Sequence, residues 1–158
     1  MSIEKVRSWF AQYGMADRIL EFPVSSATVE LAAQALQIEP CRSAKTLAFG
    51  VQDTPILIVT AGDAKVDNSR YKARFGVKAK MLSHEDAATR IGHAVGGVCP
   101  FAVNEGVQVY LDVSLKRFPT VFPAAGSSNS AIELTIPELE RFSGFLDWVD
   151  VCKAWQET

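Results

Sequence analysis

A lysine inside an apolar, strand-like run is the first feature of this sequence that could carry chemistry. Lys45 lies in the run 44–49 (AKTLAF), where removing an ammonium group from water costs free energy unless a partner or ligand compensates. A lysine that faces a pocket can hold a phosphate as a point charge. The alternative is a lysine on the solvent-facing side of an alternating strand.

A loop rich in glycine and proline is the second such feature. Residues 92–101 (GHAVGGVCPF) contain three glycines and one proline and fit no periodic element. Glycine allows positive φ and a close approach of the backbone to a ligand. Successive N–H groups in the part from Gly96 to Pro100 could therefore bind an anion or a developing oxyanion. A plain Gly/Pro turn is the alternative.

The elements that must position these residues are predicted from hydrophobic periodicity and capping signals. Helices are expected over 3–13, 28–36, 62–75 and 83–91 and from the Thr135–Glu138 capping box onward, whereas 145–151 is ambiguous. Strands are expected over 19–24, 44–51, 56–61, 77–82, 107–113, 120–122 and 131–134. Hairpin-type and crossover-type connections both occur, which predicts a mixed α/β (α+β) fold with one curved sheet, as a single domain over 1–158.

Composition narrows the class of protein. The chain has 158 residues, of which 48% are hydrophobic and 22% charged, as in ordinary globular domains. The apolar run 55–59 is far shorter than a membrane span, and the N-terminus lacks the apolar region of a signal peptide. Three dispersed cysteines without a CxxC motif favour a reducing, cytoplasmic location, and no metal-ligand spacing is present. We therefore expect no membrane partner, metal or cofactor.

Charge is unevenly distributed along the chain. Residues 65–90 carry seven basic and three acidic side chains, whereas 131–158 carry two basic and six acidic ones. The net charge of −2 argues against a long footprint on nucleic acid, DNA included, but leaves a short RNA end possible. Within the basic stretch, Lys72, Arg74 and Lys78 are candidate RNA contacts, and a solvated helix face is the alternative.

Motifs of several enzyme classes are absent. The sequence has no GxxxxGK[ST], GxGxxG, GxSxG or HExxH motif. A Cys99 nucleophile with His93 as its base is an alternative, because the two residues are six positions apart in one glycine-rich loop and could come into contact. A small buried cysteine is the favoured interpretation of Cys99. Asp112, at the end of a predicted strand, is expected either to cap the turn at Ser114 or to contact a ligand.

The order of these features resembles the YbaK and prolyl-tRNA-synthetase-associated editing domains, which are aminoacyl-tRNA deacylases. The resemblance covers roughly residues 18–140. The features that carry it are Thr28 with Ala32-Ala33, Lys45-Thr46-Leu47, Ala61-Gly62-Asp63 before Asp67, Gly96 to Pro100 with Phe101, Asp112 after the strand 107–111, Ala125-Gly126, and Ile132-Glu133-Leu134 before Leu139. This chain departs from many relatives at Cys99, where they have serine, and near Ala102, where they have glycine.

The resemblance implies a central, partly closed sheet and metal-independent hydrolysis of the ester that joins a wrong amino acid to a tRNA, often tRNA for proline. Lys45 would hold the phosphate of the terminal adenosine, and the backbone from Gly96 to Pro100 would hold the aminoacyl carbonyl. The catalytic candidates are thus Lys45, Gly96, Gly97, Val98, Cys99 and Pro100. The candidate substrate contacts are Thr28, His93, Phe101, Asp112, Gly126 and Ser127.

Three functions are compatible with these residues. The favoured one is a freestanding deacylase that edits a mischarged aminoacyl-tRNA in trans, with an aminoacyl-tRNA synthetase as a possible partner. A second is a binding module that holds a nucleotide or tRNA end without turnover. The third is an interaction protein that reuses the fold. Pocket packing would decide which amino acid is removed, at about 1–3 kcal/mol per methylene.

Overall fold

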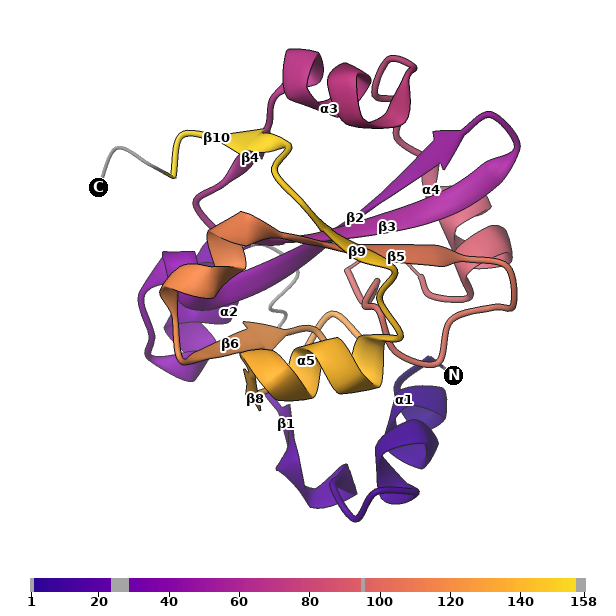
Figure 1. Ribbon diagram of the computed structural model, residues 1–158. Coiled ribbons are helices and arrows are strands. Elements are labelled where there is room, and N and C mark those ends of the chain that lie inside the picture. Colours follow the sequence, from indigo (N-terminus) through magenta and orange to yellow (C-terminus); the bar gives the residue numbers. More distant parts are fainter. Residues whose placement is uncertain (1, 24–28, 95, 156–158) are drawn as a thin grey trace.

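A curved sheet of six strands is the frame of the molecule (Figure 1). The structure is a computed structural model that describes residues 2–23, 29–94 and 96–155. The strand order is β8-β6-β2-β3-β5-β9, with parallel and antiparallel neighbours. The strands are β2 (Ser43–Val51), β3 (Thr54–Ala61), β5 (Gln108–Asp112), β6 (Thr120–Pro123), β8 (Leu134–Thr135) and β9 (Asp147–Val149). The predicted fold class, a mixed α/β fold with a curved, partly closed sheet, is confirmed.

The hairpin of β2 and β3 is the centre of this sheet. A two-residue turn joins the strands, and its first residue, Gln52, has φ +54°. Such turns match the right-handed twist of the strands they connect. The pairing runs from Val51↔Thr54 to Ala44↔Ala61. Residues 56–59 of β3 are almost completely buried, as expected for a central strand with both faces covered.

One face of the sheet is covered by α3 (Asn68–Phe75). The helix begins at Asp67, whose carboxylate accepts hydrogen bonds from the N–H groups of Ser69 and Arg70, and it ends at Gly76 with φ +80°. Tyr71 is fully buried and packs on Phe49 of β2 with 5.1 Å between ring centroids. This contact fixes α3 over the hairpin.

The opposite face is covered by α1 (Ser2–Ala11) and α5 (Ile136–Ser143). Phe10 of α1 contacts Phe101 and Phe142 with ring centroids 4.9 and 5.4 Å apart. The predicted capping box is present at the start of α5, where Thr135 and Glu138 exchange side-chain and backbone hydrogen bonds. None of the described helices is long and apolar enough to cross a membrane.

Short elements complete the molecule. The strands β1 (Ile19–Glu21) and β7 (Ser130–Ile132) pair with each other, as do β4 (Lys65–Val66) and β10 (Cys152–Lys153). The remaining helices are α2 (Val29–Leu36) and α4 (His84–Asp86), the latter continued by a π-helical turn at Ala87–Ile91. Single 3-10 turns lie at Ala16–Arg18, Pro40–Arg42 and Val113–Arg117.

Several predicted boundaries are wrong. The third helix begins at Asn68, not near residue 62, because Asp67 supplies the cap. The strand predicted over 77–82 is reduced to a single bridge, Phe49↔Met81. The ambiguous segment 145–151 contains β9, which pairs in parallel with β5. Residue 28, the first residue of the helix expected over 28–36, lies outside the described residues.

Candidate functional site

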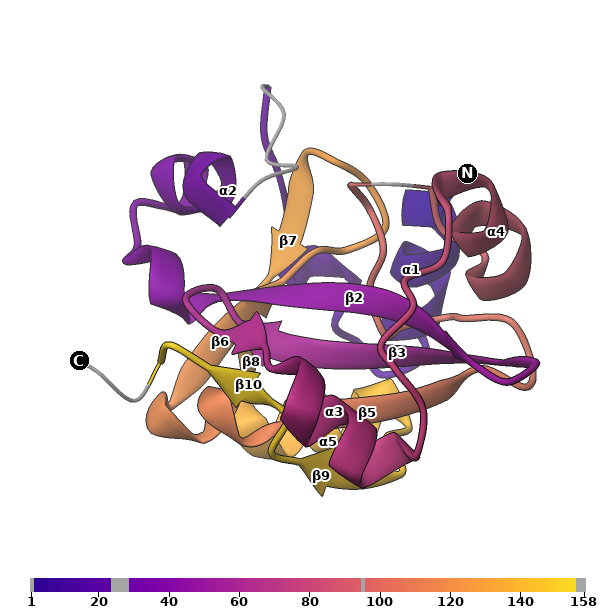
Figure 2. The same cartoon turned by 90° about the horizontal axis from the view of Figure 1, so that it is seen from above.

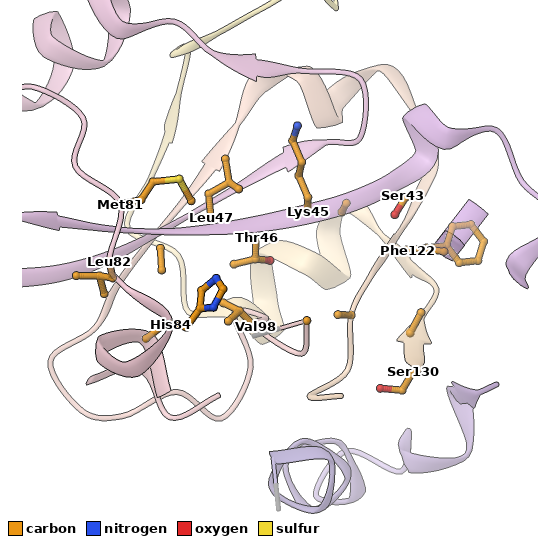
Figure 3. Close-up of a pocket in the computed structure, with 17 residues that line it drawn as sticks. Ser43, Lys45, Thr46, Leu47, Met81, Leu82, His84, Val98, Phe122 and Ser130 are labelled. Carbon is orange, nitrogen blue, oxygen red and sulfur yellow. The ribbon is translucent and has the colours of Figure 1, made fainter. Parts of the chain in front are cut away.

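A cavity of about 340 Å³ lies along one edge of β2 (Figure 3). Figure 2 shows α2, β7 and α4 arranged along this edge. The lining residues come from α2, β2, the segment 81–87, the glycine-rich loop, and the region of β6 and β7. They are Ala32, Ser43, Ala44, Lys45, Thr46, Leu47, Ala48, Met81, Leu82, His84, Ala87, Gly96, Val98, Phe122, Ala124, Ser130 and Ala131.

The cavity coincides with a gap in the pairing of β2. On its outer edge β2 pairs with β6 through Ala44. Further along the same edge, the carbonyl of Ala48 accepts a hydrogen bond from the N–H of Leu82 at 3.0 Å. Neither the pairing with β6 nor the bridge between Phe49 and Met81 extends over residues 45–47. A ligand in the cavity would therefore meet an uncovered strand edge.

Thr46 contributes a buried hydroxyl to the site. Figure 3 shows its side chain on the same side of β2 as His84 and Val98. Within the described part of the chain the Thr46 Oγ1 is buried and has no hydrogen-bond partner. Leaving a buried hydroxyl unpaired costs about 1–3 kcal/mol. An unpaired polar atom at the wall of a cavity indicates a binding site for a polar ligand.

Lys45 also lines the cavity, but its side chain takes a different direction. Figure 3 shows it on the side of β2 opposite Thr46, together with Leu47. The half-buried ammonium makes no hydrogen bond or ion pair with any described residue, and burial lowers the pKa of Lys45. Lys45 and the glycine-rich loop thus border one cavity from opposite sides of the β2 edge.

The glycine-rich loop meets a second loop at a very close contact. A Cβ on Gly97 would lie 2.6–2.7 Å from the backbone of Gly126 and Ser127, so only glycine fits there. Gly96 has φ +86° and lines the cavity beside Val98. The structure therefore brings together five predicted site residues from two loops. In the second loop, the hydroxyl of Ser127 lies 2.6 Å from that of Ser130, which lines the cavity.

Behind this loop, Cys99 is completely buried and does not line the cavity. Burial raises the pKa of the Cys99 thiol to about 12. Its sulfur lies 3.6 Å from Nε2 of His93, but that nitrogen is also 2.7 Å from the carbonyl oxygen of Phe101 and must donate its proton there. Burial lowers the pKa of His93, which favours the neutral ring. A protonated Nε2 cannot act as the base for the Cys99 thiol. The geometry thus opposes a Cys99–His93 nucleophilic pair and agrees with a buried packing role.

Two further predicted site residues, the catalytic candidate Pro100 and the substrate-contact candidate Phe101, also lie away from the cavity lining. Both are buried at the end of the glycine-rich loop, with Phe101 against Phe10. Thr28 lies outside the described residues.

Asp112 is a structural residue. One carboxylate oxygen accepts a hydrogen bond from the N–H of Ser114 and the other from the N–H of Val151, both at 3.0 Å. The predicted cap at Ser114 is confirmed, and the carboxylate is fully buried away from the cavity. The alternative, a ligand contact, has no support in this geometry.

The candidate RNA-binding residues lie on or just after α3, across the sheet from α1 and α5. Lys72 and Lys78 are exposed. Arg74 pairs with Asp147 at 3.1 Å and lies over the rings of Phe75 and Tyr110. The acidic C-terminal segment thus neutralises part of the basic stretch.

Some cavity residues were not identified from the sequence as site residues. Thr46 could have been found, because strand alternation places it on the face opposite Lys45. Nothing in the sequence marked His84 or Ser130, which reach the cavity from α4 and β7. Lys45 and His84 are the two lining side chains that can carry a charge, and no carboxylate of the described residues lines the cavity.

A comparison with protein families identifies the class to which this fold belongs. The family model of the aminoacyl-tRNA editing domain matches residues 24–142, about three quarters of the chain. The chain therefore belongs to the aminoacyl-tRNA editing domain family, as the sequence features predicted.

Individual relatives agree with this assignment. The chain is 53% identical over 157 residues to YwhH of Bacillus subtilis (strain 168), covering 99% of this chain and all of that protein. It is 28% identical over 90 residues to a proline–tRNA ligase of Bacillus velezensis, covering 56% of this chain but only 16% of the ligase. A solved structure of a candidate trans-editing enzyme for prolyl-tRNA synthetase superposes with a TM-score of 0.86 at 26% identity, covering 96% of this chain and 97% of that one.

Proposed function

We propose that this protein is a trans-editing deacylase, with 1–158 acting as one domain, that hydrolyses the ester of a mischarged aminoacyl-tRNA. The substrate we favour is tRNA for proline carrying a small wrong amino acid. The observation that carries the proposal is the cavity at the uncovered edge of β2, which is lined by Thr46, whose hydroxyl has no partner among the described residues, and by Gly96 and Val98 of the glycine-rich loop. Membership of the editing family supplies the reaction class.

The cavity offers what ester hydrolysis needs. An aminoacyl ester is already reactive toward water, so the protein has to orient it and stabilise the developing oxyanion. Backbone N–H groups of the Gly96–Val98 segment would bind the carbonyl oxygen, and one such donor is typically worth about 3–4 kcal/mol of the barrier. Water would attack the carbonyl carbon, and the ribose oxygen would leave. We include independence from metal ions in this proposal, since the required groups belong to the backbone.

Lys45 would act from the other side of the strand edge. Its half-buried ammonium, which has no partner in the part of the chain that the structure describes, is suited to hold the phosphate of the terminal adenosine. The ester and the phosphate would then lie on opposite sides of residues 45–47, with the ribose crossing the uncovered edge. Lys72 and Lys78 remain candidates for a contact with the acceptor stem, and a synthetase remains a candidate partner.

The test is deacylation of a panel of charged tRNAs by wild-type protein and by Lys45→Ala, with Lys153→Ala, an exposed lysine on β10, as the matched control. The panel contains tRNA for proline carrying Pro, Ala, Cys or Ser, together with the cognate aminoacyl-tRNAs. We expect turnover of one or two mischarged members, loss of that turnover in Lys45→Ala, and its retention in Lys153→Ala. Circular dichroism would verify that both variants fold.

Two results would contradict the proposal. Binding of tRNA without turnover of any member would favour the binding module. Unchanged turnover in a folded Lys45→Ala protein would remove the phosphate-holding role of the lysine.

A further inference from the structure

The uncovered edge of β2 presents main-chain groups that no described strand uses. Gly50 donates its N–H to the carbonyl of Lys80, and Ala48 accepts from Leu82 through its carbonyl, both at 3.0 Å. These two residues therefore direct their polar groups outward. Consecutive residues of a β-strand direct their N–H and C=O groups to opposite edges, so residues two positions apart share an edge. Thr46, two positions before Ala48, therefore directs both its N–H and its C=O outward as well.

Three polar groups consequently face the gap. They are the N–H and C=O of Thr46 and the N–H of Ala48. The carbonyl of Ala48 already accepts a hydrogen bond from Leu82. The ladder with β6 ends at Ala44, and no described residue hydrogen-bonds to Thr46 from that side. Thr46 and Ala48 both line the cavity. The C=O of Thr46 and the N–H of Ala48 are the acceptor and the donor that a single residue of a parallel strand would use, so the gap has room for one strand residue.

We propose that the aminoacyl group of the substrate binds this edge as one added β residue. Its α-amino group donates to the C=O of Thr46, and its acyl carbonyl accepts from the N–H of Ala48, as one residue of a parallel strand would do. This inference rests on the proposed function and deepens it. The N–H of Ala48 becomes an oxyanion donor in addition to those of the glycine-rich loop.

The composition of the cavity favours this occupant. No carboxylate of the described residues lines the cavity, so an α-amino group must be received by neutral acceptors. The outward C=O of Thr46 is such an acceptor, and the unpaired Oγ1 of the same residue lies on the cavity side of the strand. The edge thus recognises what all aminoacyl esters share, an amine one carbon away from a carbonyl, and leaves side-chain selection to the cavity walls.

Amide hydrogen exchange followed by NMR tests the inference on the whole chain. The probe is 3′-alanylamino-3′-deoxyadenosine, in which an amide replaces the labile ester. Without the probe, the amides of Thr46 and Ala48 should exchange at least about 100-fold faster than that of Leu47, which faces β3, and that of Gly50, which is bonded to the carbonyl of Lys80. With saturating probe, we expect the exchange of the Ala48 amide to slow about tenfold or more. Leu47 serves as the internal control, because its N–H faces β3 in both states.

A second probe isolates the amine. The matched 3′-propionylamino compound lacks only the α-amino group and should bind about tenfold more weakly, the loss expected for one hydrogen bond to a charged donor. Equal binding of the two probes would overturn the contact with the Thr46 carbonyl.

The remaining outcomes separate the two proposals. If the protein deacylates tRNA and the alanyl probe shifts the Val98 resonances while Ala48 exchange is unchanged, the edge-binding inference fails and the deacylase proposal stands. If neither deacylation nor probe binding occurs, both fail.

Discussion

At the scale of single residues, Thr46 shows how a site can be recognised from a buried polar group that lacks a hydrogen bond within the described residues. Its buried hydroxyl has no partner among the described residues, although a valine of nearly the same shape would leave nothing unpaired. Natural cores satisfy most buried polar groups, so each exception calls for an explanation. A hydroxyl kept at the wall of a cavity is explained by binding, at the expense of stability.

This explanation makes a prediction for Thr46→Val. The substitution removes the unpaired hydroxyl and keeps the β-branched shape, so the free energy of unfolding should rise by about 1 kcal/mol or stay unchanged. Deacylation should fall about tenfold, as for the loss of one hydrogen bond to a charged or reacting group. Urea denaturation and single-turnover kinetics measure the two effects. A loss of stability together with full activity would show that the hydroxyl has only a structural role.

The same scale shows what the sequence could not reveal. Cys99 and His93 lie close together, as their spacing allowed, but Nε2 of His93 donates its hydrogen bond to the carbonyl of Phe101. That contact depends on the path of the backbone after Pro100, which no residue pattern indicates. Lys45 was identified from its type and neighbours, yet the direction of its side chain depends on which edge of β2 is covered.

At the scale of elements, the site is built where two loops touch. The 92–101 loop was predicted to be functional because of its glycines, and Gly126 because of the family resemblance. Their contact through Gly97 was not foreseen, since it depends on the sheet order that places β6 beside β2. Local signals such as the Thr135 capping box could be predicted because they involve residues three positions apart.

Gly97→Ala should separate the two loops. Its Cβ would lie 2.6–2.7 Å from backbone atoms that cannot rotate away, so the loops must move. We expect a loss of about 2 kcal/mol of stability and a loss of deacylation of about tenfold or more, because a displaced oxyanion donor forfeits most of its contribution.

Gly106→Ala is the matched control for this substitution. Its φ of +90° also disfavours alanine, but a Cβ there meets nothing within 4 Å, and Gly106 does not line the cavity. It should lose stability while keeping its turnover per folded molecule. Equal loss of activity in both variants would mean that stability alone, and not the contact between the loops, controls turnover.

At the scale of the whole molecule, distant segments are joined by charge as well as by the core. Arg18, in the turn before β1, binds the carboxylate of Glu138 in α5 at 2.7 and 3.0 Å and also the carbonyl of Glu133. Through this contact the N-terminal segment is fastened to the element that follows β8. The basic and acidic halves of the sequence meet in a similar way, at Arg74 and Asp147.

The Arg18 contact predicts a pH dependence of stability. The hydrogen bond from Arg18 lowers the pKa of Glu138 from 4.5 to about 2. A lowered carboxyl pKa contributes stability that is fully present above pH 4.5 and is lost as the pH falls toward 2. The melting temperature should therefore fall less between pH 5 and pH 2.5 in Glu138→Gln than in the wild type. Glu105→Gln, in an exposed loop, should follow the wild-type curve, and identical curves for all three proteins would contradict the assigned role of the ion pair.

The uncovered stretch of β2 also bears on how the protein behaves at high concentration. Exposed strand edges template the pairing of other chains and so promote aggregation, and proteins protect them by keeping them short or covered. Among the described residues, β6 occupies one end of the edge and the Met81 bridge the other, which leaves open the short stretch from residue 45 to the N–H of Ala48. An incoming strand of ordinary length would collide with both neighbours, whereas a single residue fits. Because the gap is short, this part of the β2 edge is open to a small ligand but closed to the addition of a strand from another molecule.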